Sequence, residues 1–527
     1  MNLPVINMWF AGLPLGLFFI AFTIAILELR LINRKKSIIF KIAASIAVLC
    51  ILYVISISIA TWPGFRAGSY RDLIGEVKTG ENFSKDVAPI SVDKIRIVDQ
   101  EVAHRLGDKV IGQDPGLGSK AHLGDFRIQK VKDQLYWVAP LLHSGFFKWF
   151  RNSGTGTGAY VMVSATNERD VELVQKIGDK DIQIKYQPEG FFGQNLHRHL
   201  YMHGYMTTGV TDFTFEIDDA GHPYWVITLY GHDVGFSGAN PYGIAVVDAT
   251  TGEINEYTPD TAPEWVDRIQ PWEIVQEQLD NWGEYIHGFW NFSNEGKLTS
   301  TSGVSLVYGE DNRSYWYTGL TSVGSDEGTV GFVLVDTRTK ETTWYPQSGA
   351  TEEAARRSAM GKVQEKGYVS SFPIMYNIDG VATYVMSLKD QARLIKMIAL
   401  VSVEDFSIVG VGDNLKDALR AYKDAYNSSG NNSVFSEPDN LFEVDGRVQR
   451  INTDINNGNA YYYFTLTNVP NKLFSSSSNI STEIPLTQVN DSVRVFYQDG
   501  RAAVIEAMNF DNLELDIKAT DKSELTQ

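Results

Sequence analysis

The sequence predicts an α+β protein that is anchored in a membrane, and three observations carry that prediction. Two long apolar runs stand near the N-terminus, blocks of a helix followed by alternating strands recur through the middle, and a strand-rich segment follows a polar linker. The fold class is therefore an N-terminal transmembrane helical hairpin, tandem repeats of a helix plus an antiparallel sheet, and a small C-terminal β-barrel. The predicted divisions are 1–65 for two transmembrane helices with a basic loop, 66–207 for a membrane-proximal region and the first repeat, 208–426 for further repeats, 427–440 for a linker, 441–515 for the barrel and 516–527 for a disordered tail.

Each apolar run is long enough to cross a bilayer as a helix. The first, from Met8 to Leu27, is 20 residues without a charge, and the second, from Ile42 to Ala60, is 19. A hydrocarbon core of ~30 Å needs about 20 helical residues, so the lipid bilayer is the first predicted partner. A cleaved signal peptide is the competing interpretation, but the first residues lack a basic stretch and no small-residue cleavage site is evident before Glu28.

The charge around these runs predicts the orientation of the chain. The seven residues before the first run hold no charged side chain, whereas the connection between the runs is basic. The positive-inside rule places this connection in the cytoplasm, which predicts a two-pass integral membrane protein with its N-terminus and large C-terminal part extracytoplasmic. The basic residues are Arg30, Arg34, Lys35, Lys36 and Lys41.

The rest of the chain is acidic. The net charge is −18, and residues 1–65 hold five basic residues and one acidic residue, so the remainder carries −22. Such a surface repels nucleic acid and anionic headgroups; it suits cationic partners or divalent ions, although solubility alone explains it. The one cysteine, Cys50, lies in the second run. The exterior therefore has no disulfide, zinc-thiolate site or cysteine nucleophile.

Four blocks between the apolar runs and the linker share one pattern, in which a helix precedes two strands joined by a short polar turn. We expect helices over 92–106, 193–206, 271–285 and 351–366, and a fifth over 414–426 after the last block. An aromatic pair, reduced to one aromatic in the last block, marks a strand in each. The markers are Tyr136-Trp137, Tyr224-Trp225, Tyr315-Trp316 and Thr383-Tyr384.

The second block closes in VVDATTGE, from Val246 to Glu253. The order of helix, strand, turn and strand, followed by this motif, resembles the PepSY domain over about residues 92–426. That resemblance implies a small α/β module outside the cytoplasmic membrane that builds envelope assemblies or regulates peptidases. The segment GFFKWFRNSGTGTGAY, from Gly145 to Tyr160, departs from the pattern.

Beyond the linker, four alternating segments read as strands, with a Gly-Arg-Val start and a Pro-Leu-x-x-Val-x-Asp-x-Val entry. This pattern resembles an OB-fold barrel from Phe442 to about Leu515. Between Asp439 and Leu515 there are five basic and ten acidic residues. Nucleic acid is therefore not expected as a partner, and the resemblance implies a structural or protein-contact barrel.

Candidate chemistry is sparse. In NLHRHLYMHG, a helix would place His199 and His203 one turn apart, a spacing that suits a metal ion, whereas His197 falls off that face. No HExxH glutamate accompanies them, so these three are weak metal candidates and surface or packing roles are the simpler interpretation. No Gly-x-Ser-x-Gly motif occurs, and GTGTG lacks the Lys-Ser/Thr of a phosphate loop. No catalytic residue, cofactor site or metal is predicted.

Other candidates have ordinary structural explanations. The acidic pairs Asp218-Asp219, beside His222, and Glu310-Asp311 suit acid–base work or calcium, but turns favour the same residues. A set of tryptophans suits a carbohydrate platform, although aromatic residues on strands usually fill a core. That set is Trp265, Trp272, Trp282 and Trp290.

The function predicted from the sequence is a non-enzymatic, membrane-anchored scaffold of the cell envelope that contacts protein partners or itself. The alternative is an envelope enzyme, or a regulator of peptidases or glycans. It would use the histidine cluster or the tryptophan-rich surface.

Overall fold

The chain forms two compact units, Met1–Asn432 and Ser433–Gln527. The computed structural model describes residues 3–31, 37–81, 83, 87, 89–113, 115–118, 121–301, 303–309, 313–323, 328–429, 442–456, 459–478, 480–497 and 504–515. Most of the predicted linker, the predicted tail 516–527 and the pair Glu310-Asp311 lie outside the described residues.

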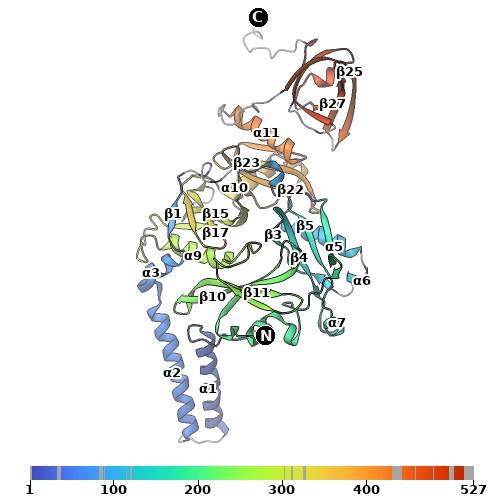
Figure 1. Ribbon diagram of the computed structural model, residues 1–527. Helices are drawn as coiled ribbons and strands as arrows, with labels where there is room; N and C mark the ends of the chain where they lie inside the picture. Colours follow the sequence, from blue (N-terminus) through green and yellow to red (C-terminus); the bar gives the residue numbers. More distant parts are fainter. Residues whose placement is uncertain are drawn as a thin grey trace. The chain divides into compact units, whose positions relative to one another are not determined.

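The first unit begins with a helical hairpin. Helices α1 (Gly12–Leu31) and α2 (Ile38–Ala60) lie side by side (Figure 1), and both are long and apolar enough to cross a membrane. The first helix begins later than the predicted span because the side chain of Asn7 accepts a hydrogen bond from the backbone of Trp9, 3.0 Å away, in a turn. The second begins earlier, since apolar residues continue on both sides of Lys41. These helices fit a membrane protein.

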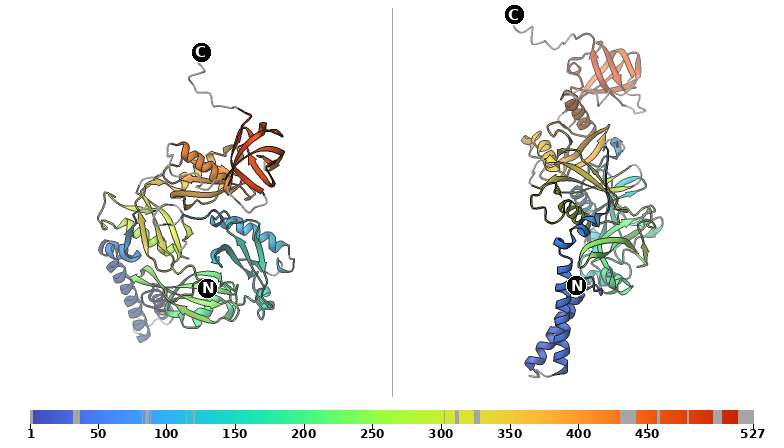
Figure 2. Two further views of the ribbon diagram at one scale, coloured as in Figure 1. Left: turned by 45° about the horizontal axis from the view of Figure 1, so that its top comes forward. Right: turned by 90° about the vertical axis from the view of Figure 1, so that its left-hand side faces the viewer.

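Four mainly antiparallel sheets of four to six strands form most of the body of this unit, grouped around its middle (Figure 2, left). The first sheet contains β2 (Ala121–Leu123), β3 (Arg127–Val131), β4 (Gln134–His143), β5 (Tyr160–Ser164) and β6 (Val171–Val174). The second contains β9 (Gly209–Ile217), β10 (Pro223–Val234), β11 (Ser237–Asp248) and β12 (Ile254–Tyr257). The third contains β13 (Leu298–Ser300), β14 (Ser305–Tyr308), β15 (Ser314–Ser322), β17 (Gly331–Asp336), β18 (Thr342–Tyr345) and a parallel edge strand, β1 (Val77–Thr79). The fourth contains β20 (Val369–Ser370), β21 (Ile374–Ile378), β22 (Val381–Lys389), β23 (Ile395–Ser402) and β24 (Val409–Gly412).

A helix precedes each sheet, and one follows the last. These helices are α5 (Gln100–Gly112), α8 (Leu196–Met202), α9 (Trp272–Glu284), α10 (Glu352–Gly361) and α11 (Leu415–Ser428). The first starts eight residues later than predicted, because the side chain of Asp99 accepts a hydrogen bond from Val102 N and caps the helix there. The second is shorter than predicted and is flanked by single turns of 3₁₀ helix, including η3 (Phe192–Gln194) and η4 (Tyr205–Thr207). A further helix, α7 (Phe146–Asn152), lies between β4 and β5, in the segment that departs from the repeated pattern.

One aromatic side chain holds the same place in all four sheets, near the start of β4, β10, β15 and β22. Each is buried and donates a hydrogen bond to a backbone carbonyl in the segment ahead of the preceding helix. The bonds run from Trp137 Nε1 to Val98 (2.8 Å), from Trp225 Nε1 to Tyr186 (2.8 Å), from Trp316 Nε1 to Gln270 (2.8 Å) and from the hydroxyl of Tyr384 to Ala350 (3.2 Å). The aromatic markers of the sequence therefore fasten each sheet to the chain that leads into it.

The sheets share their cores. One cluster of buried side chains joins the first and third sheets, including Val161 and Val333, and a second joins the third and fourth, including Phe332 and Val401. A third joins the first and second sheets. No sheet therefore buries its apolar surface alone, which is the usual consequence of small helix-plus-sheet elements.

The second unit is a closed five-stranded barrel. Its strands are β25 (Phe442–Asn456), β26 (Asn459–Leu466), β27 (Val469–Ser477), β28 (Ser492–Tyr497) and β29 (Val504–Asn512). They close in the order β25-β26-β27-β29-β28, with β27 and β29 parallel and the other neighbours antiparallel. The rings of Phe464, Phe474 and Phe510 fill the centre.

Candidate functional site

The predicted histidine candidates lie on and beside α8, but each has a structural partner. His199 is 7% exposed, its Nε2 lies 2.7 Å from the carbonyl oxygen of Gly252, and its ring contacts that of Tyr186. Burial lowers the pKa of His199, which favours the neutral ring. This side chain joins α8 to the β11–β12 turn.

The other two histidines are exposed. His203 ends α8, and its Nδ1 lies 2.7 Å from the carbonyl oxygen of His199. The ring of His197 lies 3.9 Å from that of Phe213, measured between centroids. The structure thus brings the rings of His199 and His203 together, at 4.2 Å, and leaves His197 apart. In the described part of the chain, no group of three or more His, Cys, Asp or Glu side chains is arranged to hold a metal ion.

The acidic pair of the second sheet serves a turn. Asp218 Oδ1 accepts hydrogen bonds from the backbone of Ala220 and His222. The ring Nε2 of His222 in turn lies 2.8 Å from Asp248 Oδ2. These contacts bind the β9–β10 turn to the end of β11.

A buried cluster of charges, which the sequence did not single out, lies where the first three sheets meet. Asp267 Oδ2 accepts hydrogen bonds from the backbone of Lys130 (2.8 Å) and from the hydroxyl of Tyr308 (3.0 Å). The next residue, Arg268, is 7% exposed, and its guanidinium lies 4.0 Å from the carboxylate of the fully buried Glu216. Within the described residues, Glu216 Oε2 and Arg268 Nε and Nη2 have no hydrogen-bond partner.

Burial sets the protonation of this cluster. It raises the pKa of Glu216 to about 8, against the opposing charge of Arg268, and raises that of Asp267 to about 6. We assign the neutral acid to Glu216 at neutral pH, because the nearest guanidinium nitrogen is too far away for a hydrogen bond. No local signal could have revealed this cluster, since Glu216 and Arg268 are brought together only by the fold.

A cavity of about 870 Å³ is lined in part by Tyr308 and Lys130, which also donate hydrogen bonds to Asp267 of the buried cluster. Turns of the first sheet, strands of the third and β21 of the fourth line it, together with residues that follow β1. Its wall is rich in tyrosine and its rim carries lysine and aspartate, with Lys130 Nζ 2.7 Å from Asp133. The tyrosines are Tyr308, Tyr315, Tyr317, Tyr345 and Tyr376. Its size and mixed lining suit a ligand that both stacks and forms hydrogen bonds.

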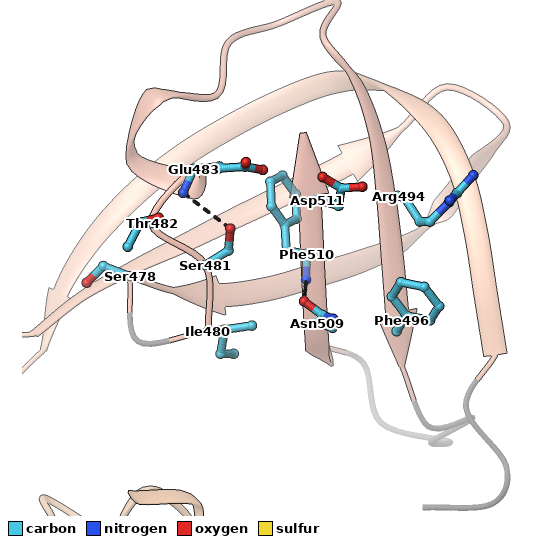
Figure 3. Close-up of a pocket in the computed structure, with 10 residues that line it drawn as sticks. All are labelled: Ser478, Ile480, Ser481, Thr482, Glu483, Arg494, Phe496, Asn509, Phe510 and Asp511. Atoms are coloured by element: carbon cyan, nitrogen blue, oxygen red, sulfur yellow. Dashed lines mark hydrogen bonds between the residues drawn. The ribbon is translucent and has the colours of Figure 1, made fainter. Parts of the chain in front are cut away.

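A smaller pocket of about 550 Å³ lies on the barrel (Figure 3). The segment that contains Ser481 and Glu483 forms one side, and Phe496 lies on the other. Glu483 is not free, because its carboxylate accepts a hydrogen bond from the backbone of Asn512 at 2.7 Å. Arg494 is held by Asp445, at 2.8 and 3.0 Å. The pocket is therefore mainly polar, with its charges engaged within the barrel.

The body is fixed to one end of the hairpin. The backbone of Ile6 donates to Met206 O at 2.7 Å, and the ring of Phe10 packs on His232, 4.4 Å away. The hydroxyl of Tyr53 donates to Met8 O at 3.1 Å, and its ring meets Phe236 at the tip of the β10–β11 hairpin. The second sheet thus lies directly on the ends of α1 and α2 that are remote from the basic connection.

The tryptophan set divides between core and surface. Trp272 and Trp282 pack against the core of the first and third sheets, and Trp265 stacks on Tyr224. Trp290 is 63% exposed and belongs to an aromatic group at the end of α2, where its ring lies 6.2 Å from that of Trp62. Exposed tryptophan beside a membrane helix is typical of the bilayer interface.

Comparisons with known proteins give little guidance. No family model matches the chain, and no curated protein matches it. A solved structure with weak similarity is the Bombyx mori GH32 beta-fructofuranosidase BmSUC1, with 10% identity over 78% of this chain and 70% of that chain. Its TM-score of 0.16 is too low to carry an argument about fold or function.

Proposed function

We propose that this chain is a two-pass membrane protein of the cell envelope whose body and barrel form an extracytoplasmic interaction scaffold. The observation that carries the proposal is the junction of Tyr53, Met8 and Phe236, which fixes a large α/β body to one end of an apolar helical hairpin. The basic connection joins the other ends of the helices. The positive-inside rule then gives the body an extracytoplasmic location.

The four sheets support the interpretation of tandem repeats. Each has an aromatic residue fastened to the chain ahead of its helix, and a shared local device of this kind is expected of units that descend from one pattern. The PepSY resemblance remains part of the proposal. For the barrel, the strand order with a parallel β27–β29 pair favours an OB-like fold.

Self-association is proposed from the sheet edges. In the described residues, β12 ends the second sheet and β6 ends the first. Edge strands present backbone donors and acceptors that a second copy or a partner strand can pair with. Two differently tagged copies, extracted together in mild detergent, should co-purify. Recovery of each tag alone would leave a scaffold for other partners but would end the self-association proposal.

Orientation is testable with single cysteines, because Cys50 is the one native thiol. In a Cys50→Ala background, Ser429→Cys reports on the body and Ser37→Cys reports on the basic connection. An impermeant maleimide should label Ser429→Cys on intact cells, and Ser37→Cys only after lysis. The reverse pattern would place the body in the cytoplasm and overturn the proposal.

A regulator or enzyme acting on envelope peptides or glycans is the second candidate, and the tyrosine-lined cavity favours it. A glycan or peptide strand would stack on Tyr315 and bond to the charged rim. Soluble peptidoglycan fragments should then bind with an affinity that Tyr315→Ala weakens, whereas Tyr242→Ala, at an exposed site outside the cavity lining, should not. Titration calorimetry that detects no heat of binding for these fragments would remove this candidate.

A further inference from the structure

The body carries a second aromatic surface, away from the group at the end of α2. Four phenylalanine side chains and one methionine side chain on α7, η3 and α8 are exposed to solvent. They are Phe146 (39%), Phe147 (85%), Phe150 (67%), Phe192 (61%) and Met202 (70%). Single exposed apolar residues need no explanation, but the rings of Phe147, Phe150 and Phe192 lie 5.6, 6.1 and 6.4 Å from that of Phe146, measured between centroids. A group of exposed rings of this kind marks a contact surface. We call this set the α7 surface.

The α7 surface is held in shape rather than loosely attached. Trp149, on the inner side of α7, is buried, and its Nε1 donates to Gln194 Oε1 at 2.7 Å. The amide of Gln194 donates in turn to Ser153 O at 2.7 Å. Rings of Phe146 and Phe191 meet at 5.2 Å between centroids. The exposed rings are therefore displayed by a fixed framework, which lowers the entropic cost of binding.

A chain of contacts places the α7 surface at the membrane end of the body. α7 is bound to η3, η3 leads into α8, and α8 leads into η4. There Met206 and Thr207 accept hydrogen bonds from Ile6 and Asn7, which lie just before the turn that leads into α1. Figure 1 shows α7 at the same lower edge of the body as the start of α1. α7 and the first turn of the hairpin thus lie at the same end of the body.

The chemistry of α7 fits a lipid interface. Its sequence, FFKWFRN, alternates aromatic residues with Lys148 and Arg151, both exposed, and contains no acidic residue. Aromatic side chains favour the headgroup region, and basic side chains between them attract anionic lipids. This local composition contrasts with the net charge of −22 carried by residues 66–527.

We propose that the α7 surface inserts its exposed rings into the outer leaflet of the same bilayer that the hairpin crosses. The inference rests on the proposed membrane anchoring. The partner is the lipid bilayer, because the surface continues an interface that α1 and α2 already define. The hairpin and the α7 surface together give the body separate points of attachment, which would fix its tilt on the membrane.

The test uses the full chain in nanodiscs of phosphatidylcholine and phosphatidylglycerol. In a Cys50→Ala background, single cysteines carrying an NBD fluorophore replace Phe147 on the surface, Phe19 in α1 and Phe406 in the turn between β23 and β24. Phe19 and Phe406 are 62% and 44% exposed, so all three sites are open to the label. Figure 1 shows β23 at the edge of the body opposite to α7, so Phe406→Cys is the matched control.

Lipid spin-labelled near the headgroup should remove about half of the fluorescence at Phe147→Cys and almost none at Phe406→Cys. Lipid labelled deep in the chain should quench Phe19→Cys. Quenching at Phe19→Cys without quenching at Phe147→Cys would overturn this inference and keep the membrane anchor. Failure at Phe19→Cys would overturn the anchor itself.

Aqueous iodide separates lipid from protein contact. A label at Phe147→Cys that is shielded from iodide yet unaffected by spin-labelled lipid would show that a second copy or another protein covers the surface, which also overturns the inference. Charge reversal by Lys148→Glu with Arg151→Glu should reduce lipid quenching at Phe147→Cys in anionic nanodiscs while leaving Phe19→Cys unchanged. Equal quenching before and after the reversal would contradict the role given to the basic residues.

Discussion

The indole nitrogen of Trp225 donates a hydrogen bond to the carbonyl oxygen of Tyr186 over 2.8 Å, and closes the chain ahead of α8 onto the second sheet. Tyr186 also contacts His199, so the same bond positions the helix that carries the candidate histidines. The bonds made by Trp137, Trp316 and Tyr384 do the equivalent work in the other sheets. Loss of one such bond should be felt beyond its own sheet.

The substitution Trp225→Phe tests this bond. It leaves the partly buried carbonyl of Tyr186 without its donor, and an unsatisfied buried acceptor costs about 1–3 kcal/mol of the free energy of unfolding. Trp290→Phe, at a 63% exposed site, should change that free energy by at most about 0.5 kcal/mol. Denaturant unfolding in detergent measures both. Equal effects would show that neither this hydrogen bond nor the burial of the indole adds measurable stability.

The buried acid Glu216 should make stability depend on pH. Its folded pKa of about 8 lies above the ~4.3 expected in the unfolded chain, so the unfolded state releases a proton that the native state holds. The free energy of unfolding of the wild type should therefore fall, relative to that of Glu216→Gln, as the pH rises from the unfolded to the folded pKa. The fall should be up to about 1.4 kcal/mol per pH unit. Arg268, Asp267 and Asp212 also act on this carboxyl.

Unfolding curves of the two proteins over this pH range measure the difference, with the exposed Glu277→Gln as the control. If the wild type instead becomes more stable relative to Glu216→Gln as the pH rises, Glu216 is ionised and paired with Arg268 in the native state.

His199 should matter to stability and not to metal binding. Its ring is buried against Gly252 and Tyr186, so His199→Ala should cost about 2 kcal/mol of the free energy of unfolding. Because burial lowers its pKa, the stabilisation by His199 should be lost as the pH falls below ~6.5. The exposed His104→Ala is the control. Stoichiometric zinc that disappears in His199→Ala would instead favour a metal site.

Gly235 should be required at the junction of body and hairpin. Its φ is +62°, and a Cβ there would lie 2.5 Å from a methyl group of Thr61 in the turn after α2. Gly367 has a φ of +64° and open space around it. Both changes to alanine carry a similar backbone cost. Gly235→Ala should therefore be less stable than Gly367→Ala by a further ~1–3 kcal/mol, measured by thermal unfolding in detergent. Equal melting temperatures would argue against this contact.

The barrel should fold alone. A fragment over residues 436–526 should be soluble and unfold cooperatively, because the second unit has its own core. Phe474→Ala should cost about 3–5 kcal/mol, and Phe442→Ala, at a 49% exposed site, far less. The fragment should bind single-stranded DNA no better than an acidic control protein. Micromolar, salt-sensitive binding would contradict the assignment as a protein-contact module.

Sequence reasoning succeeded where a local signal and the tertiary structure agree. Pro271 ahead of α9 and Asn414 ahead of α11 are start signals, and both helices begin at the next residue. At α5 the predicted start at residue 92 was wrong, because apolar residues such as Ile97 and Val98 imitate a helix, whereas their backbone nitrogens bond to Ala165 O. That bond joins residues far apart in the chain, which periodicity cannot reveal.

The site was less predictable than the fold. The charges of Glu216 and Arg268 look like ordinary surface residues until the sheets enclose them. The α7 surface did leave a trace, since its segment broke the repeated pattern. The departure from the repeated pattern therefore marked an exposed aromatic surface, whereas the spacing of the histidines marked no site.

Within the residues that the structure describes, the edge strand β1 pairs with β18 alone, which joins Val77 to Thr342 across most of the first unit. A ribosome that has released β1 must add more than two hundred further residues before its partner exists. During that time the chain just beyond the hairpin holds an unpaired strand. Biosynthesis of this protein therefore has a vulnerable interval that ends only with β18, and under the proposed membrane anchoring a chaperone that protects β1 would have to work beside the bilayer.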